Sequence, residues 1–265
     1  MKNGMPLQLP DVILPHVQGM DFARDEIGMS TGSVLIYEDR VLKVEDVRTE
    51  WQKRVDTLRW LEGKLPVPKV IASCHENGKS YLLMSRMKGH MGCDPKQMEK
   101  PEELHRLLAE GLKLFWQVDA SQCPRVRTIE DDLRLARYRV EHDLIEEFYQ
   151  DAFGDEHFQS PRALLDYLEN HVPAFDPVMS HGDYCLPNVL MEEGRLTGFI
   201  DLGDAAMADR YCDIADCYRS LKGNFGGWFT GKVYPGYDPD AFLRALPVPV
   251  DREKLRFQLL LNNLL

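Results

Sequence analysis

Residues 180–188 read SHGDYCLPN, and residues 196–201 read LTGFID. Asp183 and Asn188 lie five positions apart, on a segment that Pro187 keeps from forming a regular helix. Asp201 directly follows an apolar segment that predicts a strand. Phosphoryl transfer needs a carboxylate to orient and deprotonate a hydroxyl, and it needs oxygen ligands for Mg²⁺. The two stretches therefore predict a candidate phosphoryl-transfer site.

Two features upstream complete this set of groups. Lys43 ends an apolar strand pattern, VLKV at residues 41–44, where a charge is less expected. The small-residue loop GMSTGS at residues 28–33 leads into a strand and can present backbone N–H groups to phosphates. Taken singly, an Asp–Asn pair indicates a turn, a lysine a solvated residue, and a Ser/Gly loop a hairpin connection. Their joint order along the chain favours the catalytic interpretation.

The distribution of elements predicts an α+β protein with two lobes. Strand patterns dominate the first third, and long amphipathic helices follow Gly89. We expect a β-rich lobe over residues 1–87 and a helical lobe over residues 88–265. The predicted strands are 33–37, 41–44, 70–72 and 81–84, with shorter ones within 178–200. The predicted helices are 48–61, 101–118, 128–149, 161–170 and a leucine-rich helix after Pro249.

Composition restricts the partners and the compartment. The net charge of −11 argues against a nucleic acid or an anionic membrane and favours a cationic small molecule. Six cysteines without paired spacing predict reduced thiols. Residues 1–16 contain three prolines and an acid, which does not fit a signal peptide, so we expect a cytoplasmic protein. No pattern in the sequence indicates an oligomeric state.

Longer segments resemble a known family. They read WLEGKLPVPKV at 60–70, LLMS at 82–85, TGFIDLG at 197–203 and ADRYCDIA at 208–215, followed by RS at 219–220. Together with HGDxxxxN, these segments resemble the aminoglycoside phosphotransferase family, most closely its 3'-phosphotransferase (kanamycin kinase) branch. The resemblance runs from about Gly28 to the last helix. It implies a protein-kinase-like fold, ATP and Mg²⁺ as cofactors, and γ-phosphoryl transfer to the 3'-hydroxyl of an aminoglycoside.

The resemblance also assigns roles to individual positions. It implies that Asp183 is the catalytic base, that Asn188 and Asp201 bind Mg²⁺, and that His181 only orients the loop. The nucleotide-binding positions it implies are Lys43 on the α/β-phosphates, Ser30 and Thr31 over the β/γ-phosphates, Val41 beside the base, Ser85, Arg86 and Met87 at the adenine edge, and Glu50 near the lysine. The acceptor-binding positions it implies are Asp155, Glu156, Asn262, Asn263 and Leu265.

This sequence departs from the family pattern near the nucleotide. Val41 stands where the family usually has an aromatic residue on the base, and the loss of that stacking should weaken nucleotide binding by about 1–3 kcal/mol. Arg54 stands where the family has the glutamate that pairs with the lysine. Glu50, one helical turn earlier, is the nearest replacement.

Further departures concern the large lobe. Asp204 stands where the family commonly has arginine, and Asp216 replaces an apolar residue. Asn262, Asn263 and Leu265 replace two acids and an aromatic residue that contact the aminoglycoside in close relatives. Neutral hydrogen bonds are about half as strong as charge-assisted ones, so low affinity for classical aminoglycosides is expected.

Three alternatives remain beside the aminoglycoside kinase. The first is the same chemistry on another hydroxylated or aminated metabolite, and the second is a nucleotide-binding pseudokinase with weak catalysis. A hydrolase is the third, because GMSTG at 28–32 fits the G-x-S-x-G nucleophile elbow by letter. That motif needs an apolar strand before it and a helix after it. FARDE precedes it here and a predicted strand follows, so the context argues against a hydrolase.

Overall fold

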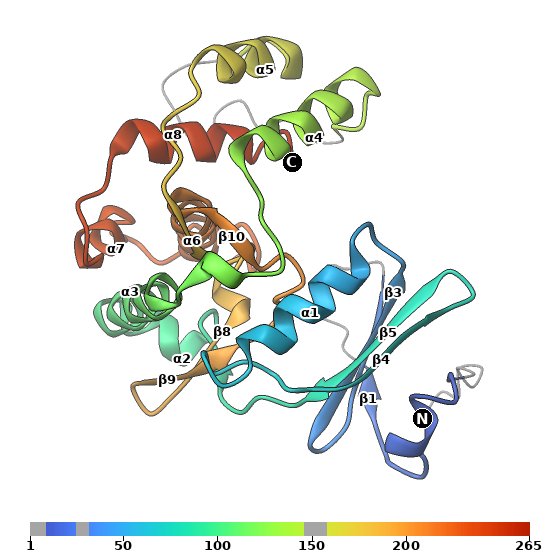
Figure 1. The fold of residues 1–265 in the computed structure, drawn as a ribbon. Helices are drawn as coiled ribbons and strands as arrows, with labels where there is room; N and C mark the ends of the chain where they lie inside the picture. Colours follow the sequence, from blue (N-terminus) through green and yellow to red (C-terminus); the bar gives the residue numbers. More distant parts are fainter. Residues whose placement is uncertain (1–8, 25–31, 146–157) are drawn as a thin grey trace. The chain divides into compact units, whose positions relative to one another are not determined.

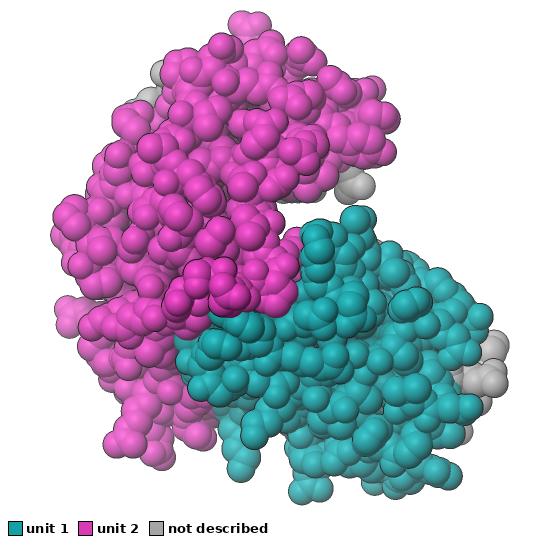
Figure 2. Space-filling model, viewed as in Figure 1, with its two compact units in different colours: residues 1–88 teal, residues 89–265 magenta. Residues whose placement is uncertain are grey.

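The computed structural model describes residues 9–24, 32–145 and 158–265. The chain divides into two units, Met1–Lys88 and Gly89–Leu265, which Figure 2 shows in teal and magenta. Each unit has a hydrophobic cluster of its own. The lobe boundary predicted from the sequence lies between residues 87 and 88, whereas the two units divide between residues 88 and 89.

The amino-terminal unit is built on a five-stranded antiparallel sheet in the order β1-β2-β3-β5-β4 (Figure 1). Asn77 and Gly78, which connect β4 to β5, both have positive φ (51° and 76°), as expected for an Asn-Gly hairpin turn. Helix α1 packs against β4. The bounds are β1 Ala23–Arg24, β2 Ser33–Ile36, β3 Arg40–Asp46, α1 Trp51–Leu61, β4 Val70–Glu76 and β5 Lys79–Ser85, with a 3₁₀ turn, η1, at Leu14–His16 before them.

The two faces of this sheet differ because side chains alternate along each strand. Leu42 and Leu83 are fully buried on one face, where Ile13 from the segment beside η1 packs against them. Val41 and Lys43 are half-buried on the opposite face. The register places Lys43 directly across from Val34 and Leu82, so these neighbours share its face.

The carboxy-terminal unit is mainly helical. Its described helices are α2 Pro95–Met98, α3 Pro101–Gln117, η2 Ala120–Gln122, α4 Ile129–Glu141, α5 Pro161–Asn170, η3 Leu186–Asn188, α6 Arg210–Phe225, α7 Asp240–Ala245 and α8 Arg252–Leu261. Side chains cap the starts of two of these helices: Thr128 forms a capping box on α4, and Asp209 caps α6. These caps satisfy backbone N–H groups that a helix start leaves without partners.

Short strands in this unit hold the loops that carry the candidate site. Strands β7 (Pro177–Ser180) and β10 (Ala206–Asp209) pair antiparallel, with Ser180 opposite Ala206. Strands β6 (His90–Met91), β8 (Val189–Glu192) and β9 (Arg195–Phe199) form a second sheet. Residues 181–188 therefore connect β7 to β8, and residues 200–205 connect β9 to β10. Two loops with predicted site residues thus emerge from paired strands.

The structure confirms the predicted α+β architecture and corrects some bounds. The helix expected over 128–149 ends at Glu141, because Asp143 takes a positive φ of 52° that an α-helix does not allow. The residues from 146 onward in that prediction lie outside the described part of the chain. The helix expected from residue 48 begins at Trp51, since Glu50 has a φ of 58°.

All six cysteines are free, as their spacing predicted. Among the helices of the described residues, none combines the length and the apolar character needed to cross a membrane.

Helix α3 packs so closely on the first loop that the contact predicts a stability effect at Gly111. An added Cβ there would lie 2.1 Å from the hydroxyl oxygen of Tyr184, which donates a hydrogen bond to the carbonyl of Leu108. Alanine normally stabilises a helix interior by about 1 kcal/mol relative to glycine. Overpacking costs about 1–3 kcal/mol, so we expect Gly111→Ala to lower the free energy of unfolding measured in urea.

Tyr184→Phe supplies the control for this prediction. It removes the hydroxyl, so Gly111→Ala should cost less in that background than in the wild-type chain. Equal costs in both backgrounds, or stabilisation by Gly111→Ala alone, would contradict the packing argument.

Candidate active site

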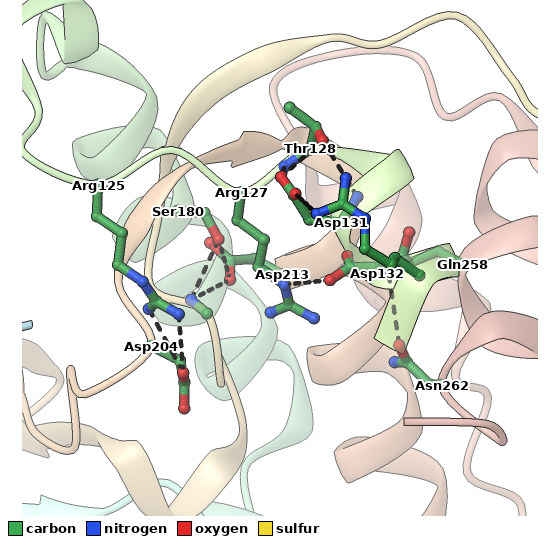
Figure 3. Close-up of polar contacts among 12 residues, drawn as sticks. Arg125, Arg127, Thr128, Asp131, Asp132, Ser180, Asp204, Asp213, Gln258 and Asn262 are labelled. Atoms are coloured by element: carbon green, nitrogen blue, oxygen red, sulfur yellow. Dashed lines mark hydrogen bonds and ion pairs between the residues drawn. The ribbon is translucent and has the colours of Figure 1, made fainter. Parts of the chain in front are cut away.

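A buried carboxylate holds the turn at the start of the first loop. Asp213, on α6, is 1% exposed and accepts three hydrogen bonds from the turn (Figure 3). The hydroxyl of Ser180 donates at 2.9 Å, the backbone N–H of His181 at 2.8 Å and that of Gly182 at 3.0 Å. Burial raises the pKa of Asp213, while His181 and these donors oppose the rise. The three bonds fix the backbone directly before Asp183.

His181 links the first loop, residues 181–188, to the second loop, residues 200–205, from inside the carboxy-terminal unit. Its ring is fully buried among Phe115, Tyr184 and Phe199. The Nδ1 atom accepts from the backbone N–H of Asp183 at 3.3 Å, so Nε2 carries the proton and donates to the carbonyl of Ile200 at 3.0 Å. The residue it reaches directly precedes Asp201. His181 thus contacts both the Asp183 backbone and the residue before Asp201.

Asp183 and Asn188 meet at the end of the turn. The side-chain Nδ2 of Asn188 donates to the Asp183 carboxylate Oδ2 at 2.9 Å and to the Asp183 carbonyl at 3.0 Å. Asn188 is 7% exposed, whereas Asp183 is exposed. The buried amide therefore orients one carboxylate oxygen of Asp183. The carboxylate of Asp183 itself remains accessible to a substrate hydroxyl.

Asn188 and Asp201 form a donor set that fits Mg²⁺. Both bonds of Asn188 use its side-chain nitrogen, which leaves the amide oxygen as a cation ligand. The backbone N–H of Ile200 donates to the Asn188 carbonyl at 3.0 Å, which brings the exposed Asp201 into the same region. One carboxylate, one amide oxygen and substrate phosphates are the kind of set that Mg²⁺ uses. The described residues contain no group of three or more His, Cys, Asp or Glu side chains able to hold a metal.

In the amino-terminal unit, Lys43 pairs with an acid that sequence reasoning missed. Its Nζ lies 3.1 Å from Oε1 of Glu45, two positions further along β3. Glu50, the predicted replacement partner, forms an ion pair with Lys53 at 2.6 Å, and Nε of Arg54 donates to the carbonyl of Thr49. Strand alternation was the signal for Glu45, because residues i and i+2 share a face.

The face that carries Lys43 is apolar around it. Val41 pairs with Ile36 on one side and with Met84 on the other, as Lys43 does with its own neighbours. The half-buried apolar side chains that share this face are Val34, Ile36, Val41, Leu82 and Met84. Val41 therefore belongs to a wider apolar surface. Of its residues, the sequence analysis had named only Val41.

The segment predicted to receive the adenine edge leaves β5. The backbone N–H of Ser85 donates to the carbonyl of Lys69, and that of Arg86 to the carbonyl of Asp39. The side chain of Ser85 accepts from the N–H of Lys69 at 2.9 Å. The backbone N–H groups of Ser85 and Arg86 are therefore already bonded within the protein. The next N–H along the segment is that of Met87.

The predicted acceptor-binding residues at the end of the chain have different surroundings. The amide of Asn262 donates to the Asp216 carboxylate at 2.9 Å, whereas that of Asn263 donates to the carbonyl of Leu259 in α8. Leu265 packs against the hydrophobic cluster between α4, α5 and α8. The remaining predicted site residues, Ser30, Thr31, Asp155 and Glu156, lie outside the described residues.

Asp216, on α6, is a perturbed carboxyl in this unit. Burial and the neighbouring carboxylates of Asp213 and Asp183 raise its pKa to about 8, against the opposing effect of Arg127 and Arg219. Asp216 is thus electrostatically coupled to the candidate base and hydrogen-bonded to Asn262.

Comparison with known proteins identifies the family. Residues 36–249 match the model of the "Phosphotransferase enzyme family". The chain belongs to this phosphotransferase family. Its enzyme class is therefore the one that the sequence predicted.

Individual relatives narrow the kinship. An aminoglycoside 3'-phosphotransferase of Enterococcus faecalis is 34% identical over 251 residues, covering 91% of this chain and 92% of the relative. One of Staphylococcus aureus is 33% identical over 250 residues, covering 91% and 92%. The crystal structure of a type VIII aminoglycoside-3'-phosphotransferase matches with a TM-score of 0.76 at 25% identity, covering 95% of this chain and 96% of that one.

One solved structure carries ligands. An aminoglycoside phosphotransferase of Streptomyces rimosus, solved with ADP and streptomycin, has a TM-score of 0.72 at 21% identity and covers 96% of both chains. At that identity the likeness bears on the fold alone. The predicted resemblance to the aminoglycoside 3'-phosphotransferases and the predicted kinase-like fold are both confirmed.

The raised pKa of Asp216 predicts a pH effect on the stability of the phosphotransferase. Between about pH 4 and pH 8 the folded chain holds a proton on Asp216 that the unfolded chain has lost. This group therefore makes the folded state less stable as pH rises, by at most about 1.4 kcal/mol per pH unit. Asp216→Asn lacks the effect, so the variant should gain stability relative to wild type towards pH 8 in denaturant titrations.

Asp240→Asn is a control with the opposite sign. Arg252 lowers the pKa of Asp240, so this variant should lose stability relative to wild type above about pH 4. Parallel stability curves for wild type and Asp216→Asn from pH 5 to pH 8 would show that Asp216 is not perturbed.

Proposed function

We propose that this phosphotransferase moves the γ-phosphoryl group of ATP to the 3'-hydroxyl of an aminoglycoside. The observation that carries the proposal is the exposed Asp183 carboxylate, held 2.9 Å from the Asn188 amide at the end of a turn anchored by Asp213. The named relatives at 33% and 34% identity support the acceptor class.

The proposed step uses Asp183 as a base on the acceptor. The hydroxyl donates a hydrogen bond to the carboxylate, and its oxygen attacks the γ-phosphorus in line with the leaving oxygen. The new O–P bond forms as the bond to the β-phosphate oxygen breaks, and the hydroxyl proton passes to Asp183. ADP leaves with the electron pair of the broken bond. The bond from Asn188 occupies Oδ2 of Asp183, so the hydroxyl proton would pass to the other carboxylate oxygen.

The phosphates need neutralisation, for which this chain offers three side chains. Asn188 and Asp201 would hold Mg²⁺, which when bound neutralises charge that develops on the phosphate oxygens. Lys43 would bind the α/β-phosphates as a point charge, with Glu45 directing its ammonium group. These roles match those implied by the resemblance, except that Glu45 takes the place expected of Glu50.

The adenine would lie on the apolar face of the sheet. Val34, Val41 and Met84 are half-buried there, and the Met87 N–H follows at the end of the strand segment. Aliphatic contacts on this face would supply dispersion in place of the missing aromatic ring. The resemblance to the aminoglycoside phosphotransferases implies ATP as the phosphoryl donor.

The hydrogen-bonded pair Asn262–Asp216 is the group we propose to bind the phosphoryl acceptor. Asp216 supplies a carboxyl to a region where the chain end has lost two acids. An ammonium group of a polycation would favour the ionised form of this carboxyl. We propose that part of the lost charge at the chain end is supplied in this way from α6.

The central test replaces the base. In Asp183→Asn the amide cannot accept the hydroxyl proton, so kcat for ADP release should fall about 10²–10⁴-fold, the usual contribution of general base catalysis. KM for ATP should change little, because Asp183 does not hold the nucleotide. Steady-state kinetics with a 3'-hydroxyl aminoglycoside measure both constants. Asp166→Asn, an exposed change on α5, is the matched control and should retain full activity.

Acceptors distinguish the remaining alternatives. ADP release should be stimulated by aminoglycosides that carry a 3'-hydroxyl and not by 3'-deoxy analogues. Stimulation by both kinds would move the reaction to another hydroxyl, and stimulation by none would favour a different metabolite as acceptor. Binding of Mg-nucleotide without transfer to any hydroxylated amine would make the chain a pseudokinase.

A further inference from the structure

An arginine from a distant segment reaches the loop that carries Asp201. Both terminal nitrogens of Arg125, Nη1 and Nη2, lie 3.4 Å from Oδ1 of Asp204, and Nη1 also lies 3.4 Å from the carbonyl of Gly203 (Figure 3). Arg125 is only 9% exposed, although 79 positions separate it from Asp204. The contact is therefore a part-buried, long-range one. It joins residues just before α4 to the loop between β9 and β10.

The same loop presses against the turn before Asp183. Gly182 has a φ of 83°, and a Cβ there would lie 2.3 Å from the carbonyl oxygen of Asp204. The backbone of the 200–205 loop thus touches the turn at the position where only glycine fits. A shift of Asp204 would move Asp201 on one side and disturb Gly182 on the other.

The backbone around Arg125 is itself anchored. The N–H of Met207 donates to the carbonyl of Arg125 at 2.9 Å, and the N–H of Arg127 donates to the carbonyl of Met207 at 2.9 Å. Met207 belongs to β10, which pairs with β7 directly before the turn. The backbone of Arg125 is therefore bonded to β10, which pairs with the strand before the turn. Its guanidinium contacts the loop that carries Asp201.

The sequence gives this contact a reason. Asp204 lies three positions after Asp201 in the same loop. A carboxylate beside a magnesium-binding loop adds a negative charge that can attract or displace the cation. Here Arg125 neutralises that carboxylate and also holds the Gly203 carbonyl, which a planar fork of donors does better than a single ammonium group.

We propose that Arg125 is a positioning residue for phosphoryl transfer, which holds the 201–204 loop against Gly182 and thereby sets Asp201 relative to Asp183 and Asn188. This inference rests on the proposed function, in that Asp201 is taken as a magnesium ligand. Arg125 acts through Asp204 and Gly203 and touches no reacting atom. Its effect should therefore fall on the cation and on kcat, and it should leave the acceptor KM unchanged.

The first measurement does not depend on turnover. Binding of Mn²⁺ in the presence of ADP, followed by electron paramagnetic resonance, should weaken about 10–100-fold in Arg125→Met, the usual effect of removing a partner behind a metal ligand. Arg125→Lys keeps a charge but loses the fork, so it should fall between the wild type and Arg125→Met. Arg137→Met breaks a half-exposed ion pair with Glu169 between α4 and α5 and serves as the control, with unchanged Mn²⁺ affinity.

The second measurement uses coupling between the two residues. In kinetics against Mg²⁺, Asp204→Asn should lessen the effect of Arg125→Met, because no uncompensated carboxylate then remains. The exchange Arg125→Asp with Asp204→Arg should recover part of the lost Mg²⁺ activation, since it restores an ion pair with the arginine at position 204. Additive effects of the two single changes would overturn the proposal.

These outcomes separate this inference from the proposed function. If wild type turns over no aminoglycoside but Arg125→Met still loses Mn²⁺ affinity, the acceptor is wrong and the role of Arg125 stands. If Arg125→Met does not fold, Arg125→Lys provides the Mn²⁺ measurement. Wild-type Mn²⁺ affinity and wild-type Mg²⁺ activation in a folded Arg125 variant would overturn the positioning role.

Discussion

The buried carboxylate of Asp213 accepts hydrogen bonds from Ser180, His181 and Gly182, and the candidate site depends on the backbone that these bonds fix. A carboxylate this deep in the unit is costly to desolvate unless donors surround it. The residue that directly follows these donors, Asp183, is exposed. Helix α6 thus anchors the start of the loop that carries Asp183.

From this turn, contacts extend to the other candidate groups in the unit. His181 reaches Ile200, which precedes Asp201, and Asn188 reaches Asp183. The second loop touches Gly182 through Asp204. The candidate base and the candidate magnesium ligands lie on two loops, and each is within one contact of the anchored turn. Such dense support is what a reaction governed by positioning and electrostatics requires.

Local patterns predicted a large part of this arrangement. Strand alternation and helical periodicity gave the two kinds of lobe, and HGDxxxxN with a following Asp marked the loops, because these features depend on neighbours in sequence. The pairs Arg125–Asp204 and Asn262–Asp216 were not predictable in this way, since 79 and 46 positions separate their members. Glu45 was missed although alternation places it on the face of Lys43. The predicted continuation of α4 failed at the left-handed Asp143.

The measurement that tests the account most directly is the position of the phosphate on the product. A proton–phosphorus correlation spectrum of an aminoglycoside incubated with the enzyme, ATP and Mg²⁺ would show it. The account predicts one new phosphorus signal coupled to the proton on the 3' carbon. Coupling to any other carbon position, or no phosphorylated product at all, would contradict it.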